Sequence, residues 1–159
     1  MTPTITDVPE EAAKAGFEIG KDGVSSVVVG VDGSPPSLNA AAWAAGLARR
    51  ENATLVLVYV EPVTSAAYWT PLGMASATEA AQAYLAELRE TAGHYLSEHG
   101  VHWEVVHQRG DPATALESVA DELKADCIVV GKSRRRGGLL GTVPKGLLAH
   151  SMRPVVVVP

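Results

Sequence analysis

The stretch Ser26–Pro36, SVVVGVDGSPP, decides the fold class of this chain. Its β-branched run from Val27 to Val31 is typical of a strand that is buried on both faces of a parallel sheet. The run ends at Asp32-Gly33-Ser34, a cluster of turn-forming residues that also offers a helix cap. A buried strand that leads straight into a helix start predicts an α/β domain.

The alternation of strand and helix signals continues to the end of the chain. Further strands are predicted over residues 54–60, 101–107, 127–130 and 155–158, and helices over 37–50 and 78–99, from Pro112 onward, and over 143–150. Asp111 is placed to cap the helix that has Pro112 at its first position. This order predicts right-handed crossovers and an open parallel sheet with helices on both faces, which makes three layers.

The helix over 37–50 is rich in alanine, and its packed side is harder to define than its ends. Leu38, Ala42, Ala45 and Leu47 recur at helical spacing. We expect these four side chains to face the sheet.

The connection over residues 61–77 is long and punctuated by proline and glycine, so it is predicted to be irregular. Tyr68, Trp69 and Met74 make it unusually apolar for a solvated connection. Two interpretations stay open: the segment covers a cleft or a partner, or it packs onto its own sheet.

The bulk composition fits one compact domain with a sizeable core. The chain has 159 residues, of which 47% are hydrophobic and 19% charged, with a net charge of −5. An acidic surface repels nucleic acid and anionic membranes, so neither is an expected partner. The dense basic cluster Arg134-Arg135-Arg136 favours a small anionic ligand instead.

The chain is expected to divide into a flexible acidic extension over residues 1–24 and a folded domain over 25–159. The extension lacks the basic start and apolar run of a signal peptide. The single cysteine, Cys127, sits in an apolar run and is expected to be a small buried hydrophobe. No stretch approaches the ~20 apolar residues of a membrane span. A cytoplasmic location is the natural interpretation.

Two segments are expected to meet at the carboxyl end of the sheet, where open α/β sheets bind ligands. Gly30-Val31-Asp32 offers a carboxylate after the first strand, although Asp32 also suits simple capping of the next helix. The segment from Val130-Gly131 to Gly141-Thr142 offers glycines and then a helix N-terminus, whose free N–H groups favour phosphate. The spacing is neither the dinucleotide fingerprint nor Walker A, because Lys145 does not follow a glycine directly.

Four motifs that follow one another in the chain make a family resemblance specific. They are Val27–Ser34 (VVVGVDGS), Gly110-Asp111-Pro112, Ala125–Gly131 (ADCIVVG) and Gly137–Val158 (GGLLGTVPKGLLAHSMRPVVVV). Together they resemble a single-domain universal stress protein of the actinobacterial kind, over residues 25–159. The resemblance implies a five-stranded parallel sheet in the order 3-2-1-4-5, of the adenine nucleotide α-hydrolase type. It also implies a homodimer that pairs the last strands, which would cover the apolar edge at Val155–Val158.

The same resemblance implies an adenine nucleotide as ligand: ATP, AMP or cyclic AMP, with Mg²⁺ only where ATP is bound. The residues implied are Gly30, Val31 and Asp32 for adenine or ribose, Val60 for adenine, Val130 and Gly131 for ribose, and Gly141, Thr142 and Val143 for phosphate.

The phosphate loop departs from the pattern of the ATP-binding members. Arg134 stands where they carry a second glycine, and the interval from there to Gly141-Thr142 is three residues short. Pro144 replaces a serine or threonine, which removes a hydroxyl and an N–H group. These changes disfavour the usual triphosphate pose. The guanidinium of Arg134 either contacts a phosphate in place of lost backbone donors or lies in a solvated loop.

The preferred function is therefore a stress-response or regulatory protein that binds an adenine nucleotide. It is not expected to be an enzyme, beyond slow incidental ATP hydrolysis, because no nucleophile with a base and no paired carboxylates are visible. The histidines between 94 and 107 lack a convincing zinc pattern, so no structural metal is expected. The alternative is a dimeric interaction module that kept the fold and lost the nucleotide. An enzyme of the α-hydrolase architecture is a third hypothesis, but the extra catalytic segments that it would need are absent.

Overall fold

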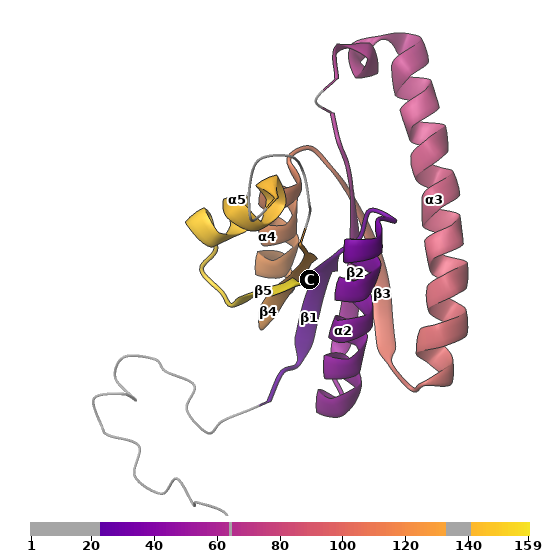
Figure 1. Cartoon of the computed structure of the whole chain (residues 1–159). Helices are drawn as coiled ribbons and strands as arrows, with labels where there is room; N and C mark the ends of the chain where they lie inside the picture. Colours follow the sequence, from indigo (N-terminus) through magenta and orange to yellow (C-terminus); the bar gives the residue numbers. More distant parts are fainter. Residues whose placement is uncertain (1–22, 64, 133–140) are drawn as a thin grey trace, which may run out of the picture.

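A computed structural model describes the chain over residues 23–63, 65–132 and 141–159. Five parallel strands form one sheet in the order β3-β2-β1-β4-β5, with helices on both faces (Figure 1). The elements in chain order are β1 (Ser26–Gly30), α2 (Pro35–Glu51), β2 (Thr54–Glu61), η1 (Ala66–Trp69), α3 (Pro71–Glu98), β3 (His102–Arg109), α4 (Pro112–Glu122), β4 (Cys127–Gly131), α5 (Thr142–His150) and β5 (Val155–Val158). The predicted fold class and strand order are confirmed. The predicted extension over 1–24 lies almost wholly outside the described residues.

The central strand β1 is buried on both faces because helices cover each of them. Val27 and Val29 pack with α2 and the C-terminal half of α3, whereas Val28 packs with α4 and α5. All three valines are fully buried. Burying such a side chain stabilises the fold by about 1.5–3 kcal/mol, so the β-branched run both forms the strand and holds the two layers on it.

Helix α2 lies close to the sheet through small side chains. Its buried residues are Ser37, Ala40, Ala44 and Ala48, and Leu38 is 52% exposed. The packed side predicted from Leu38, Ala42, Ala45 and Leu47 is therefore only partly right: Ala45 and Leu47 pack against the core, whereas Leu38 and Ala42 are exposed. Alanine burial costs no side-chain entropy and lets the helix backbone approach the strands, so the smallest residues rather than the largest ones face the sheet.

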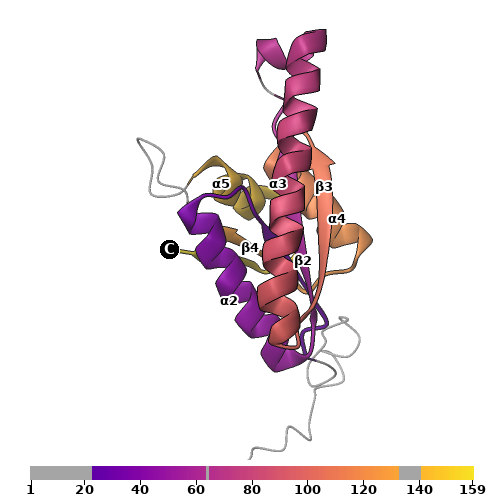
Figure 2. The ribbon, with the colours of Figure 1, turned by 90° about the vertical axis from the view of Figure 1, so that its right-hand side faces the viewer.

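The segment over 61–77 is more regular than predicted. Helix α3 begins at Pro71, and the short helix η1 precedes it. Thr70 caps α3 by accepting a hydrogen bond from the N–H of Gly73 at 3.0 Å, and Pro71 occupies the first helical position. This cap and proline are the same local signal that starts α4 at Asp111-Pro112. η1 and the first turns of α3 project beyond the sheet (Figure 2).

The sheet ends on one side at β5, which pairs with β4 along Val155–Val158. All four valines of β5 are only partly buried. In the part of the chain that the structure describes, no strand pairs with the outer edge of β5. An unpaired strand edge of this kind can pair with another chain.

Candidate functional site

The loop after β1 presents Asp32 at the carboxyl end of the sheet. Val31 is buried and donates its N–H to the carbonyl of Val58 at 2.9 Å, which extends the pairing of β1 with β2. The chain then turns at Gly33, whose φ of +80° favours glycine. Asp32 Oδ1 accepts from the N–H of Ser34 at 2.9 Å, while Ser34 itself caps α2. Asp32 is exposed, so its carboxylate can face a ligand.

The Asp32 carboxylate is held in its charged form. Partial burial alone would raise its pKa, but hydrogen bonds from the hydroxyl and N–H of Ser34 and from Ser37 outweigh it, and the pKa lies below the usual 3.8. At neutral pH Asp32 is an acceptor of hydrogen bonds and not a donor. Hydroxyl or amino groups are the ligand groups that suit it.

The ends of β1 and β4 lie side by side. Val29 is paired with Val129, and a Cβ built on Gly30 would lie 3.7 Å from Val130. Beyond this pair, Gly131 lies against the backbone of Pro36 at the start of α2, where a Cβ would clash. Only glycine allows this close approach of the two β–α connections. The predicted contacts at Gly30, Val130 and Gly131 are thus adjacent in space.

The N-terminus of α5 follows β4 and has no side-chain cap. Gly141 occupies the cap position and is buried, and because glycine has no side chain it accepts no capping hydrogen bond from the first turn. Thr142 is exposed, and Val143 packs into the core with α4 and β5. The N–H groups of a first helical turn lack intrahelical partners and favour an anion. Pro144, at the third helical position, carries no N–H, so this first turn offers one donor fewer than usual.

Tyr59 from β2 and Tyr84 from α3 lie beside the loop that carries Asp32. The ring of Tyr84 from α3 lies over Gly33 and 4.8 Å, centroid to centroid, from the ring of Tyr59. Burial, together with the charge of Asp32 and the Tyr59 ring, raises the pKa of Tyr84 to about 12. Burial also raises the pKa of Tyr59, as do the charges of Glu61 and Asp32. Both phenols are neutral at physiological pH and place aromatic surface beside the Asp32 loop.

Glu61 completes this side of the sheet edge and was missed as a site residue in the sequence. It is 2% exposed, and its Oε2 accepts from Nε of Arg109 at 3.1 Å and lies 3.1 Å from Nε2 of His107. Its Oε1 is also buried and accepts no hydrogen bond from any residue that the structure describes. One signal was available: Glu61 continues the inward alternation of Leu57 and Tyr59, which puts its side chain under α3 and not in water.

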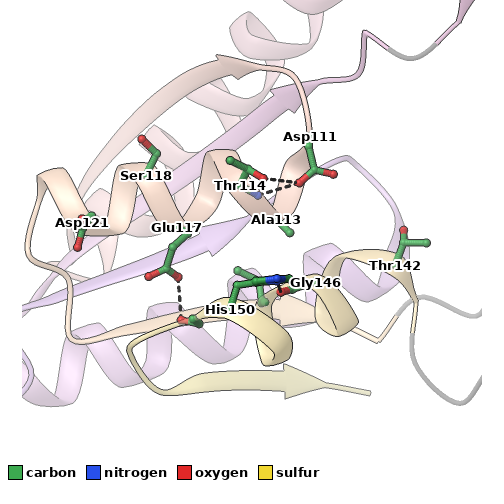
Figure 3. A pocket seen from close by; sticks show the side chains of 11 residues that line it. Asp111, Ala113, Thr114, Glu117, Ser118, Asp121, Thr142, Gly146 and His150 are labelled. Carbon is green, nitrogen blue, oxygen red and sulfur yellow. Dashed lines mark hydrogen bonds between the residues drawn. The ribbon is translucent and has the colours of Figure 1, made fainter.

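A groove of about 450 Å³ runs between α4 and α5 (Figure 3). Asp111 and Thr142 lie at one end, and Glu117, Asp121 and His150 lie further along. Glu117 accepts from Ser151 at 2.7 Å. Of the predicted site residues that the structure describes, only Thr142 lines the groove, and the carboxylates of the groove disfavour a phosphate. Apart from Thr142, the groove therefore shares no described residue with the predicted site at the ends of β1 and β4.

The family of the chain follows from its sequence over the folded part. The family model described as the universal stress protein family matches residues 23–159. The chain belongs to the universal stress protein family. No curated protein sequence matches this universal stress protein significantly.

Solved structures of other universal stress proteins share the fold. One solved in complex with cyclic AMP is 31% identical, with a TM-score of 0.63, and the match covers 85% of this chain and 96% of that one. UspA from Lactobacillus plantarum is 21% identical, with a TM-score of 0.73 and coverage of 86% and 98%. A family protein from Arabidopsis thaliana with AMP bound is 24% identical, with a TM-score of 0.62 and coverage of 84% and 90%.

Most predicted site residues of this universal stress protein lie at the carboxyl edge of the sheet. Val60, near the end of β2, packs toward α4 and is partly buried. Arg134 lies outside the described residues, as do its two neighbouring arginines. Among the described residues, no group of three His, Cys, Asp or Glu side chains is placed to hold a metal ion. Nor is any described helix long and apolar enough to cross a membrane.

Proposed function

We propose that this universal stress protein binds an adenine nucleotide at the carboxyl end of the sheet, beside the ends of β1 and β4. The observation that carries the proposal is the arrangement of three features along one edge: the ionised, exposed Asp32, the Gly30–Val130 contact, and the uncapped N-terminus of α5. A relative that is 31% identical was solved with cyclic AMP, which supports the ligand class. The Arabidopsis thaliana family protein carries AMP.

In this proposal each edge residue has one role. Asp32 accepts a hydrogen bond from a ribose hydroxyl or the adenine amino group, and the backbones of Gly30, Val31 and Val60 border the base. Val130 and Gly131 lie by the ribose, while Gly141, Thr142 and Val143 receive the phosphate. Arg134 adds a guanidinium contact. We propose a monophosphate in preference to ATP, because Pro144 removes a donor and the interval before Gly141 is short; Mg²⁺ enters only with ATP.

In this proposal the protein is a cytoplasmic regulator and not an enzyme, and it acts as a homodimer through β5. The partly buried valines of β5 support the dimer, as does its outer edge, which no described strand covers. Two such edges pair by main-chain hydrogen bonds and bury apolar surface. A structural change that nucleotide binding causes between β4 and α5 would then reach β5, because Lys132, next to the end of β4, donates its N–H to the carbonyl of Val158.

Thermal unfolding with ATP, AMP and cyclic AMP tests the ligand class. A ligand at about 100 times its dissociation constant stabilises the fold by about 2.7 kcal/mol, and we expect AMP or cyclic AMP to give the largest rise in Tm. If none of the three nucleotides raises the Tm, the result contradicts nucleotide binding and favours the interaction module.

The site assignment has its own test in Asp32→Ala. We expect a loss of affinity of about 10-fold or more, because a charged hydrogen-bond acceptor is worth roughly 1.5–3 kcal/mol. Asp32→Asn keeps an acceptor oxygen but loses the charge, so its nucleotide affinity should lie between that of the natural chain and that of Asp32→Ala. Glu98→Gln removes an exposed carboxylate near the end of α3 and serves as the charge-matched control. Unchanged affinity in Asp32→Ala, measured by calorimetry, would remove Asp32 from the site.

A further inference from the structure

The groove between α4 and α5 is a surface feature that the proposed nucleotide site leaves almost unused. Its volume of about 450 Å³ lies within the range of known ligand pockets. Most of its lining is apolar, with Ala113, Gly146 and Leu147 where the two helices meet. Gly146 lets α5 approach α4, because a Cβ there would lie 2.8 Å from the Cβ of Ala113. The groove therefore has an apolar floor at the contact of the two helices.

Carboxylates lie along the α4 wall of this groove. Asp111 is at one end, Asp121 is at the other, and Glu117 lies between them (Figure 3). Among the described residues that line the groove, none is a lysine or an arginine. Hydrogen bonds from Thr114 lower the pKa of Asp111, so this carboxylate is charged at neutral pH. An apolar channel with charges of one sign along its wall attracts a ligand of the opposite sign.

Arg153 shows how these carboxylates receive a guanidinium. Its Nη2 donates to Oδ1 of Asp121 at 2.7 Å, and its Nη1 lies 3.9 Å from Oε1 of Glu117. The side chain of Arg153 is only 14% exposed, whereas that of Asp121 is 78% exposed. Asp121 can therefore accept further hydrogen bonds on its solvent side. Since Arg153 offsets one of the three carboxylate charges, the groove stays negative.

The length of α4 fixes the spacing of the cations that fit the groove. Asp111 and Asp121 are ten residues apart, which corresponds to about 15 Å along a helix. An extended peptide covers this length in about four to five residues. Because side chains alternate along an extended chain, positions i and i+4 point to the same side. Two basic side chains at this spacing can reach both aspartates at once.

The polar groups of the groove favour a peptide among cationic ligands. The hydroxyls of Ser118 and Thr142 also line it, and a hydroxyl can both donate and accept a hydrogen bond. They suit the alternating N–H and carbonyl groups of a peptide backbone, whereas a polyamine has no carbonyl to offer. Small side chains between the two basic ones would lie on the apolar floor. Each part of the groove thus matches one part of an extended basic peptide.

We propose that the α4–α5 groove binds an extended basic segment of a partner protein, with one basic side chain at Asp111 and a second at Asp121. The ion pairs are exposed and contribute little each, so the contact is weak and sensitive to salt. Apart from Thr142, the groove shares no described residue with the proposed nucleotide site. The peptide and nucleotide titrations can therefore fail independently of one another.

Titration of the full chain with the peptide acetyl-Arg-Ala-Ala-Ala-Arg-amide tests the proposal. We expect saturable binding, with shifted amide signals in NMR spectra confined to α4, α5 and their connections. The peptide acetyl-Gln-Ala-Ala-Ala-Gln-amide has the same length without the charges and should bind about tenfold more weakly or worse. Shifts spread over the whole acidic surface would overturn the proposal. Spermidine that binds as tightly as the arginine peptide would overturn it as well.

Two pairs of variants separate the groove from general attraction to an acidic chain. Ser118→Lys places a cation at an exposed position in the groove and should weaken the arginine peptide about tenfold, whereas Ser76→Lys adds the same charge on α3 and should not. Asp121→Asn should weaken the peptide more than Glu122→Gln, which removes a neighbouring exposed carboxylate that does not line the groove. Equal effects within both pairs contradict a groove site.

The chain's own basic cluster, Arg134–Arg136, is the competing occupant and lies outside the described residues. A variant in which all three arginines are replaced by glutamine tests it. We expect this variant to bind the arginine peptide as the natural chain does. Clearly tighter binding in the variant would assign the groove to the chain's own arginines and overturn the proposal of a partner protein.

Discussion

Glu61 places a carboxylate under α3 where it has almost no contact with water. Its partners are not buried to the same degree: the side chains of His107 and Arg109 are 28% and 50% exposed. Loss of a partner therefore strands a buried charge, whereas loss of Glu61 returns its partners to solvent. The interaction is asymmetric, and its two halves should respond differently to substitution.

We expect Arg109→Met to lower the free energy of unfolding by about 1–3 kcal/mol, because it leaves the buried carboxylate of Glu61 with His107 as its remaining partner. Glu61→Leu should cost less, since it also removes the unpaired Oε1. The double variant should resemble Glu61→Leu and not the sum of the two. Urea unfolding of the four proteins in this cycle provides the measurement, and simple additivity would contradict a buried pair.

Tyr84 offers a second test beside Asp32, because its hydroxyl is buried and, among the described residues, has no well-formed hydrogen bond, only a weak approach to the backbone of Gly33. Tyr84→Phe therefore removes a polar atom that gains little in the folded state. We therefore expect the free energy of unfolding to stay level or to rise by up to about 1 kcal/mol. Tyr95→Phe removes an exposed hydroxyl from the same helix and should have no effect. A clear loss of stability in Tyr84→Phe would mean that the hydroxyl has a partner in solution.

At the scale of elements, the start of α3 depends on Thr70 and Pro71 and on little else. We expect Thr70→Ala to cost about 1 kcal/mol, but locally, because η1 contacts α3 and not the sheet. Amide exchange should become faster in residues 66–77, while residues 81–98 keep their protection. Thr70→Ser retains the capping hydroxyl and is the control. Loss of protection along the whole of α3 would show that η1 and the first turns of α3 do not open independently of the rest of the helix.

The elements that the sequence predicted well are those in which local chemistry and the core agree. The run Val27–Val31 is β-branched and also buried, and Asp111-Pro112 starts a helix that is packed on the sheet. The first turns of α3 were mispredicted because they face no core, so no apolar stripe accompanies the Thr70-Pro71 signal. In α2 the packed side was predicted only in part, since Leu38 was expected inside but is exposed, while Ser37 and the alanines at 40, 44 and 48 are buried.

For the whole molecule, the order of strands and the edge that carries the candidate site follow from the alternation of β and α elements, so both were predictable. The sequence also placed Asp32 and Gly131 at this edge, where a turn or a close approach restricts the residue type. Glu61 and Tyr84 could not be predicted in the same way. Their role depends on how α3 lies over β2 and β3, and only tertiary packing determines that.

Acid stability is a property of the whole chain, because aspartates at both ends of the sheet contribute to it. Hydrogen bonds from Thr114 lower the pKa of Asp111 below 3.8. At Asp126 burial would raise the pKa, but hydrogen bonds from Ser25 and Ser26 outweigh it and lower the pKa. The pKa of Asp32 is lowered as well. A carboxyl with a lower pKa in the folded state binds fewer protons than in the unfolded state, so protonation favours unfolding.

We therefore expect the free energy of unfolding to be level from neutral pH down to about pH 5 and to fall as the pH drops through about 4 and below. Asp126→Asn should be less stable than the natural chain at neutral pH, because the charged acceptor for Ser25 and Ser26 is lost. It should also lose less stability on acidification, so the two curves converge at low pH. Urea unfolding at a series of pH values measures both curves. Parallel curves would show that the carboxylate of Asp126 titrates alike in the folded and unfolded chains, and that its hydrogen bonds to β1 do not hold in solution.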